Sequence, residues 1–173
     1  MKMYPLEPAG EDLLRRTQAH SVAAHEFPVS AARLFALLEE GPTWCEFFPV
    51  IRNLEWTSPR PFSEGTTRTV TVIGGIRLDE VFWAWKPDSR MGFAITAASN
   101  RALKGLVELY DVLPLDEQRC KLRWEMGIEL NGRMSIAERS MPSSLHRTQT
   151  WCMKRLERLA VRRLPASRGA RTP

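Results

Sequence analysis

The side chains most often used in catalysis are sparse in this chain, and their spacing matches no familiar active-site motif. The 173 residues contain no GxSxG, P-loop, GxGxxG or HExxH signature. His20 and His25 are expected on one strand, where their spacing directs them to opposite faces and prevents joint binding of a metal ion. With His146, they are interpreted as surface or core-edge histidines, because a metal site or a triad needs further partners.

Four polar residues of the central and C-terminal parts of the chain could reach a pocket: Arg68, Glu80, Tyr110 and Gln149. A Glu80 carboxyl group enclosed by Phe82 and Trp124 would have a raised pKa and could act as an acid or a base. The alternative is a solvated strand carboxylate or an ion-pair partner of Arg68. Glu80, Arg68 and Tyr110 are therefore candidate catalytic residues to which the sequence assigns no reaction.

These candidates lie within a stretch, 50–130, that has the pattern of consecutive strands. Segment 66–73 is almost entirely β-branched, and a Gly74-Gly75 link to segment 76–85 predicts a tight hairpin. Further strands are predicted over 50–56, 91–98, 102–113 and 120–130. Both faces of 76–85 carry aromatic residues, which indicates either a bulge or cover on both sides of the sheet.

The segment 120–130 has the clearest period of two in the chain. Its apolar members are Cys120, Leu122, Trp124, Met126, Ile128 and Leu130. One face of this strand should therefore be buried and the other wet. Trp124, Met126 and Phe82, with Phe93 behind them, are predicted to line a cavity on the concave face, and Trp44 and Phe48 are predicted to lie near its mouth.

The flanking segments complete an α+β order. A strand over 19–28 precedes a helix capped by Ser30, and Gly41-Pro42 separates that helix from a second short one over 43–48. Residues 1–16 are expected to be a mobile lead-in. A long helix over 143–164 carries an apolar stripe, and the basic tail 165–173 is expected to be disordered. The members of the stripe are Leu145, Cys152, Leu156 and Leu159.

A curved antiparallel sheet of six or seven strands, packed on this long helix, is the expected architecture, because strand twist accumulates and the helix is its one available cover. Residues 17–164 then form a single domain with a space between sheet and helix. The side chains expected to enclose a ligand there include Leu145, Cys152 and Leu156 of the helix stripe.

Positive charge is concentrated at the C-terminal end. From Arg147 onward there are eight lysines and arginines and one acid, whereas the whole chain has a net charge of +5. The basic face has Trp151 near it and allows two interpretations. It could contact an anionic membrane surface, or it could be a solvated helix face with no partner. No nucleic acid partner is expected, because no aromatic stacking platform accompanies the charge.

Composition indicates an ordinary globular protein in a reducing cytoplasm. Hydrophobic residues make up 43% and charged residues 26% of the chain. Three cysteines give no disulfide framework, and Cys120 and Cys152 are interpreted as small core residues. No apolar run is long enough for a membrane span, and the first residues lack the apolar segment of a secretion signal.

The order of segments resembles the SRPBCC superfamily, which includes START lipid-transfer domains, birch-pollen allergens and polyketide cyclase/dehydrase-like proteins. The similar segments are PVSAARLFALLEEGPTWCEFFPVIRNLEW at 28–56, EGTTRTVTV at 64–72 and EVFWAWKPDSRMGFAI at 80–95. The resemblance implies a helix-grip fold with an internal cavity for an apolar molecule. It implies no particular reaction, because carriers, enzymes and regulators share the fold.

Binding of an apolar small molecule, such as a lipid, polyketide or isoprenoid, is the expected function. The first alternative is a polyketide cyclase or dehydratase that uses the same cavity. The second is an interaction module that contacts an anionic membrane through the basic helix. No cofactor or metal ion is expected, and the sequence does not indicate an oligomeric state or name the ligand.

Overall fold

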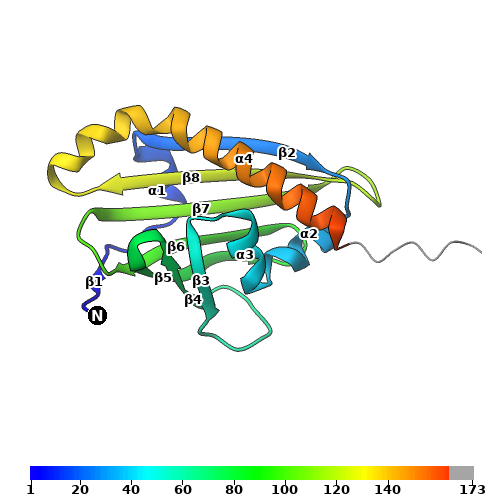
Figure 1. Ribbon diagram of the computed structural model, residues 1–173, viewed down its shortest axis with the longest axis horizontal. Coiled ribbons are helices and arrows are strands. Elements are labelled where there is room, and N and C mark those ends of the chain that lie inside the picture. Colours follow the sequence, from blue (N-terminus) through cyan, green and yellow to red (C-terminus); the bar gives the residue numbers. More distant parts are fainter. Residues whose placement is uncertain (164–173) are drawn as a thin grey trace, which may run out of the picture.

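The computed structural model, which describes residues 1–163, is a curved antiparallel sheet with a long helix across it (Figure 1). The elements, in chain order, are β1 Tyr4–Pro5, α1 Glu11–Arg16, β2 Ala19–Phe27, α2 Ala31–Leu38, α3 Gly41–Phe47, β3 Ile51–Trp56, β4 Thr67–Val72, the 3-10 turn η1 Ile73–Gly75, β5 Ile76–Lys86, β6 Arg90–Ala98, β7 Leu103–Pro114, β8 Cys120–Leu130, the 3-10 segment η2 Gly132–Ser140 and α4 Met141–Arg162. The predicted α+β class and the helix-grip arrangement are confirmed.

The sheet has the order β2-β8-β7-β6-β5-β4-β3, and every neighbouring pair is antiparallel. The first long strand therefore pairs with the last one, and β2 and β3 form the two edges. The two-residue β1 pairs with β6 and makes eight strands, one more than the upper number predicted. Strand twist along this order curves the sheet, and its concave face receives α2, α3 and α4.

Local signals set the helix boundaries much as predicted. The Ser30 hydroxyl accepts a hydrogen bond from the backbone N–H of Arg33 at 3.3 Å, as an N-cap residue does. Pro42 lies in the first turn of α3, where its missing N–H costs no hydrogen bond. Helix α4 begins two residues earlier and ends two residues earlier than the predicted 143–164. The predicted tail 165–173 lies outside the described residues.

Strand β8 buries the face that its alternation predicted. Trp124 and Met126 face the concave side, opposite Tyr110 and Glu108 of β7 in the pairing register. Because side chains alternate along a strand, these four residues share one face of the sheet. This register places two polar groups of β7 beside the apolar face of β8.

Strand β5 has both features that its aromatic residues indicated, namely a bulge and cover on both sides of the sheet. Its pairing with β6 is irregular after Asp79 and again after Phe82, so the alternation is interrupted. Phe82 points into the concave core, whereas Trp83 packs on the outer face. There it covers Gly92, where a Cβ atom would lie 2.7 Å from the Trp83 ring.

Residues 1–16 were expected to be a mobile lead-in, but residues 11–16 form a helix, α1, that packs on the sheet. Helix α1 covers the convex face of β7 and β8 with Leu13 and Leu14, which are 0% and 3% exposed. The glycines of those strands make room for it, because Cβ atoms at Gly105 and Gly127 would lie 2.7 and 2.9 Å from Leu13. A short segment of six helical residues gave too little period to predict this contact.

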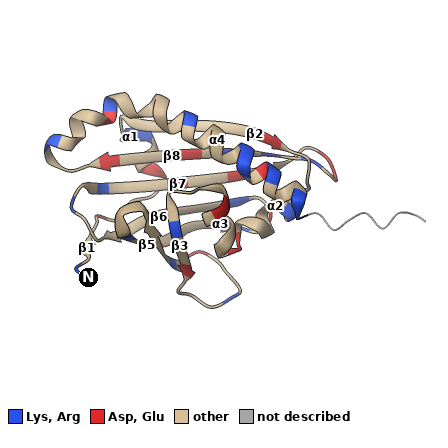
Figure 2. Ribbon diagram, in the orientation of Figure 1, with Lys and Arg blue, Asp and Glu red and all other residues tan. Residues whose placement is uncertain are grey.

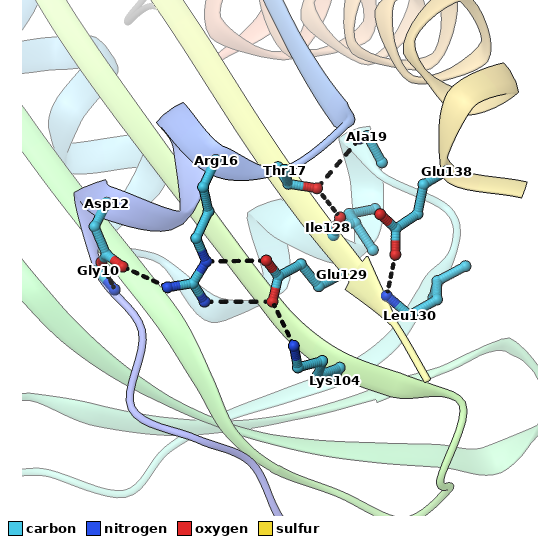
Figure 3. A network of polar contacts seen from close by, with 10 residues as sticks. All are labelled: Gly10, Asp12, Arg16, Thr17, Ala19, Lys104, Ile128, Glu129, Leu130 and Glu138. Atoms are coloured by element: carbon cyan, nitrogen blue, oxygen red, sulfur yellow. Dashed lines mark hydrogen bonds and ion pairs between the residues drawn. The ribbon is translucent and has the colours of Figure 1, made fainter. Parts of the chain in front are cut away.

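Ionic contacts hold α1 in place on the convex face. Figure 3 shows the Arg16 guanidinium between Asp12 of its own helix and Glu129 of β8, with N···O distances of 2.7 and 2.9 Å. Lys104 of β7 approaches the same Glu129 carboxylate at 3.7 Å. At the end of β8, Glu138 accepts the backbone N–H of Leu130 at 2.7 Å and ties η2 to the sheet.

Candidate functional site

A cavity of about 420 Å³ lies between the concave face of the sheet and the first half of α4. Its lining is mostly apolar, which is typical of sites for small molecules. The lining residues are Phe48, Val50, Ile51, Val70, Val72, Ile76, Leu78, Glu80, Ile95, Asn100, Ala102, Leu103, Leu106, Glu108, Met126, Ile128, Leu130, Leu145 and Thr148.

The cavity is open on one side and closed on the other. Val50 before β3 and Thr148 of α4 are exposed, and Leu145 and Val72 are half-buried. These residues mark the mouth between α4 and the β3–β4 edge of the sheet. The lining residues toward the middle of β5 and β7 are buried, so that region is the closed end.

Two carboxyl groups stand at the closed end of this apolar space. Glu80 of β5 and Glu108 of β7 are 5% and 6% exposed, and both line the cavity. They are the only charged side chains among the lining residues of the described chain. A ligand that fills the apolar part would bring one end to them.

Arg68 of β4 forms an ion pair with Glu80 from a position outside the cavity lining. Its Nε donates to Glu80 Oε2 at 2.5 Å, and Arg68 and Glu80 face each other in the pairing of β4 with β5. The guanidinium lies between the rings of Trp44 and Phe93, 4.1 and 4.3 Å from their centroids. Burial raises the pKa of Glu80, and contact with Arg68 opposes that rise.

Glu108 has hydrogen-bond donors but no cation in contact with it among the described residues. Its Oε2 atom accepts from the Tyr110 hydroxyl and, at 2.9 Å, from Trp124 Nε1. Burial raises the pKa of Glu108 to about 7, while the two hydrogen bonds act in the opposite direction. Burial also raises the pKa of Tyr110 well above its usual value, so the phenol remains a donor.

The chemistry available at the closed end is therefore acid–base chemistry. Glu108 loses or gains its proton near neutral pH, where a general acid or base is most effective. Glu80 remains in direct contact with a permanent cation and is better suited to holding a ligand group. The three predicted catalytic candidates, Arg68, Glu80 and Tyr110, are all buried around this point, although only Glu80 lines the cavity.

The predicted ligand-binding residues divide into two groups. Phe48, Met126 and Leu145 line the cavity. The others are fully buried in the core beyond its closed end, namely Trp44, Phe82, Phe93, Trp124, Cys152 and Leu156. The prediction of an open space between Trp124, Phe82 and the helix stripe therefore differs from the structure.

Aromatic packing explains why that space is filled. The rings of Tyr110 and Trp124 stack with centroids 5.1 Å apart, and Phe82 and Phe93 lie 5.3 Å apart. The ring of Trp44 closes over Tyr110 at 5.4 Å, which places Trp44 in the core rather than near the mouth. These rings and the Arg68 guanidinium occupy the volume that a ligand would have needed.

Glu108 is the site residue that sequence reasoning missed. It stands two residues before Tyr110 on the same strand, so the two side chains share a face. The signal was therefore available once Tyr110 was assigned to the concave face. Glu108 was given no role in the sequence analysis, because it is a single acid within the apolar segment LVELY.

Other polar and sulfur groups near the core have structural roles. The buried Gln149 of α4 accepts from the Ser21 hydroxyl at 2.7 Å and donates to the Trp124 carbonyl at 3.1 Å. It joins α4 to β2 and β8 and does not line the cavity. Burial raises the pKa of the Cys120 and Cys152 thiols to about 11 and about 12, which disfavours the reactive thiolate.

Residues 18–160 match the family model described as polyketide cyclase/dehydrase and lipid transport. The chain belongs to this family. The resemblance to the SRPBCC superfamily, stated from segment order, is confirmed by this match and by the fold.

Two mycobacterial proteins are similar to this chain in sequence. Uncharacterized proteins of Mycobacterium tuberculosis and Mycobacterium bovis are 35% identical over 130 residues, which covers 75% of this chain and 77% of theirs. They support the family assignment and leave the ligand open.

Solved structures of the same fold are more distant in sequence. An aromatase/cyclase from Streptomyces sp. R1128 superposes with a TM-score of 0.68 at 14% identity, covering 87% of this chain and 98% of that one. A START superfamily protein from Mycobacterium smegmatis gives 0.66 at 10% identity, covering 83% and 97%. At such identities the family's fold is shared, and activity does not transfer.

The histidines of this family member pair with single acids or the backbone. His20 lies 2.7 Å from Glu125, and His25 lies 2.7 Å from Glu157. His146 Nδ1 lies 2.9 Å from a backbone carbonyl oxygen. Within residues 1–163, no group of three or more His, Cys, Asp or Glu side chains is placed to hold a metal ion.

The basic face of α4 is partly engaged by α3. Figure 2 shows basic residues along α4 and the one acidic residue of α3 beside its last turns. Arg155 donates to the backbone carbonyl of Glu46 at 2.7 Å, and Arg162 lies 3.8 Å from the Glu46 carboxylate. Trp151 is 47% exposed, with Arg155 4.9 Å from its ring. Contact with an anionic membrane stays a prediction, which co-sedimentation with anionic and neutral vesicles would test.

None of the helices within residues 1–163 combines sufficient length with sufficient apolar character to cross a bilayer.

Proposed function

We propose that this protein binds an apolar small molecule inside the cavity, with the polar end of the molecule at Glu80 and Glu108. The observation that carries the proposal is the contrast between a long apolar lining and two buried carboxyl groups at its closed end. Isolated buried acids destabilise a fold unless something pairs with them. A ligand group at this point would supply hydrogen bonds that the apolar lining lacks.

Native mass spectrometry after mild purification tests the proposal and can also identify the ligand. We expect an added mass of one small molecule per chain, which is released by organic solvent. Leu106 lines the cavity from β7, so Leu106→Trp should fill the space and remove the added mass. Leu115→Trp is a matched control, because Leu115 is 44% exposed and does not line the cavity. An adduct that persists equally in Leu106→Trp would contradict the proposal.

Catalysis of the cyclase or dehydratase type is the second candidate, and the raised pKa of Glu108 favours it. A carboxyl group that titrates near pH 7 in an apolar site can remove a proton beside a ligand carbonyl. The similar aromatase/cyclase structure carries that activity in its description and lends analogy only.

A ketone probe separates catalysis from binding. Decan-2-one in D₂O exchanges the protons beside its carbonyl, and proton NMR follows the loss of signal. Catalysis by Glu108 predicts faster exchange with the wild type, and a decrease of roughly 100-fold in the enzymatic rate for Glu108→Gln. Binding of decan-2-one should persist in this variant. If the ketone binds and the exchange rate stays at the solvent value, the protein is a carrier for this class of molecule.

A further inference from the structure

The charge at the closed end of the cavity restricts which head group a ligand can carry. Glu80 and Glu108 both line the cavity, whereas no lysine, arginine or histidine does so within the described residues. The other polar lining residues are Asn100 and Thr148, which are half-buried and exposed. A head group at the closed end therefore meets acidic groups and no free cation.

Arg68 is the nearest cation, and the structure keeps it away from a ligand. Its side chain is 1% exposed and does not line the cavity. Its Nε is engaged by Glu80, and rings of Trp44 and Phe93 cover the guanidinium. Arg68 therefore neutralises Glu80 without lining the cavity, and Glu80 is the member of the pair that a ligand would contact.

Each carboxyl group uses one oxygen in the hydrogen bonds of the described residues, and both groups line the cavity. Glu80 engages Arg68 through Oε2, and Glu108 accepts both Tyr110 and Trp124 through Oε2. No hydrogen bond among the described residues involves Oε1 of Glu80 or of Glu108. Carboxylate oxygens accept hydrogen bonds, so they fit a head group that donates one.

From this arrangement we infer that the cavity selects apolar molecules that end in an uncharged, hydrogen-bond-donating group such as a hydroxyl, and rejects those that end in a carboxylate. The inference rests on the proposed function, because it names the class of ligand for the same cavity. A hydroxyl would donate to a free Glu80 or Glu108 oxygen. A carboxylate would lie near the negative charge of Glu108, which no cation in contact compensates among the described residues, in a space of low dielectric constant where the repulsion is strong.

Matched ten-carbon probes test the selection. Isothermal titration at pH 8 compares decan-1-ol, decanoic acid and methyl decanoate, which carries no charge. We expect the alcohol to bind about 100-fold more tightly than the acid. Methyl decanoate should bind at least about tenfold more tightly than the acid, since loss of the charge alone relieves the repulsion. Equal or tighter binding of the acid would overturn the inference, and so would an ester that binds no better than the acid.

Two variants show that the discrimination arises at the proposed place. Glu108→Gln keeps an acceptor for Tyr110 and Trp124 but removes a charge, so the alcohol-to-acid ratio should fall about tenfold. An unchanged ratio in a folded Glu108→Gln protein, checked by circular dichroism, would contradict the inference. Should this variant fail to fold, the ester comparison on the wild type decides alone.

Leu106→Trp separates the inference from the proposed function. Loss of binding for every probe in this variant places the probes in the cavity. Tight binding of the acid in the wild type, lost in Leu106→Trp, would overturn the inference and leave the proposed function standing. Binding of no probe by the wild type would overturn both.

Discussion

Glu80 and Glu108 share one apolar cavity but differ in how their charge is compensated. Glu80 has the Arg68 guanidinium at 2.5 Å, whereas Glu108 has only the neutral donors Tyr110 and Trp124. A buried carboxylate with hydrogen bonds alone gains its proton more readily than one with a cation. The two residues are therefore suited to different tasks, with Glu108 exchanging protons and Glu80 holding charge.

Titration of Glu108 should be visible in stability. Burial raises its pKa from 4.5 to about 7, so between these pH values the folded chain holds a proton that the unfolded chain has released. Stability from this group is therefore highest at low pH and falls by about 3 kcal/mol as the pH rises to 8. Since Glu108→Gln does not titrate, its free energy of unfolding relative to the wild type should rise by about 2–3 kcal/mol from pH 5 to pH 8.

Urea unfolding at both pH values measures this change. Glu64→Gln, at an exposed position, controls for loss of a carboxyl group. A Glu108→Gln difference that is independent of pH would show that Glu108 titrates alike in the folded and unfolded chains.

The Arg68–Glu80 pair should show strong coupling. Arg68→Met leaves Glu80 as a buried acid without its cation, and we expect a loss of about 3–5 kcal/mol in the free energy of unfolding at pH 7. The double variant Arg68→Met/Glu80→Gln has no such uncompensated charge and should be more stable than the single one. Additive effects in urea unfolding would contradict the pairing.

For single residues, the sequence indicated which polar side chains lie near the cavity more reliably than which apolar side chains line it. The sequence indicates that Glu80, Arg68 and Tyr110 could reach a pocket, and it leaves an ion pair with Arg68 as an alternative for Glu80. The structure buries all three residues and forms that ion pair. Trp44 and Phe82 could not be placed in solid core instead of a cavity wall, because both positions look apolar in sequence. Only the summed volume of the packed side chains decides between them.

Among the elements, α1 adds a layer that the strand pattern did not predict. It lies on the convex face, where Leu13 fits against Gly105 and Gly127. The seven longer strands were predicted from β-branched content, turn residues and, over 120–130, a period of two, and α4 was predicted from its long apolar stripe. A helix of six residues offers less than two turns of period, and its contacts are set by glycines on distant strands.

A methyl group on β7 should disturb α1. Gly105→Ala places Cβ 2.7 Å from Leu13 Cδ1, and we expect a loss of about 1–3 kcal/mol in the free energy of unfolding. Hydrogen exchange should rise in residues 11–16. Gly10→Ala is the matched control, since the nearest atom to its Cβ would be 3.7 Å away. In a Leu13→Ala background the Gly105→Ala cost should nearly disappear, and a cost that stays the same would contradict this packing.

The space between the sheet and α4 is filled by side chains at one end and contains the cavity at the other. Aromatic rings, Arg68 and the last turns of α4 fill one end of the grip, and the first half of α4 spans the cavity at the other. Segment order predicted that a space would exist between sheet and helix. Its position along α4 could not be predicted, because it depends on how far the aromatic cluster extends from α3.

A crystal structure with 10-bromodecan-1-ol tests the central claim most directly, because anomalous scattering from bromine locates the tail of the probe. We expect one molecule in the cavity, with the hydroxyl at hydrogen-bond distance from Glu80 or Glu108 and the bromine toward Leu145 and Val50 at the mouth. A bromine peak at the closed end beside Glu108, or a probe bound only on the outer surface, would contradict it.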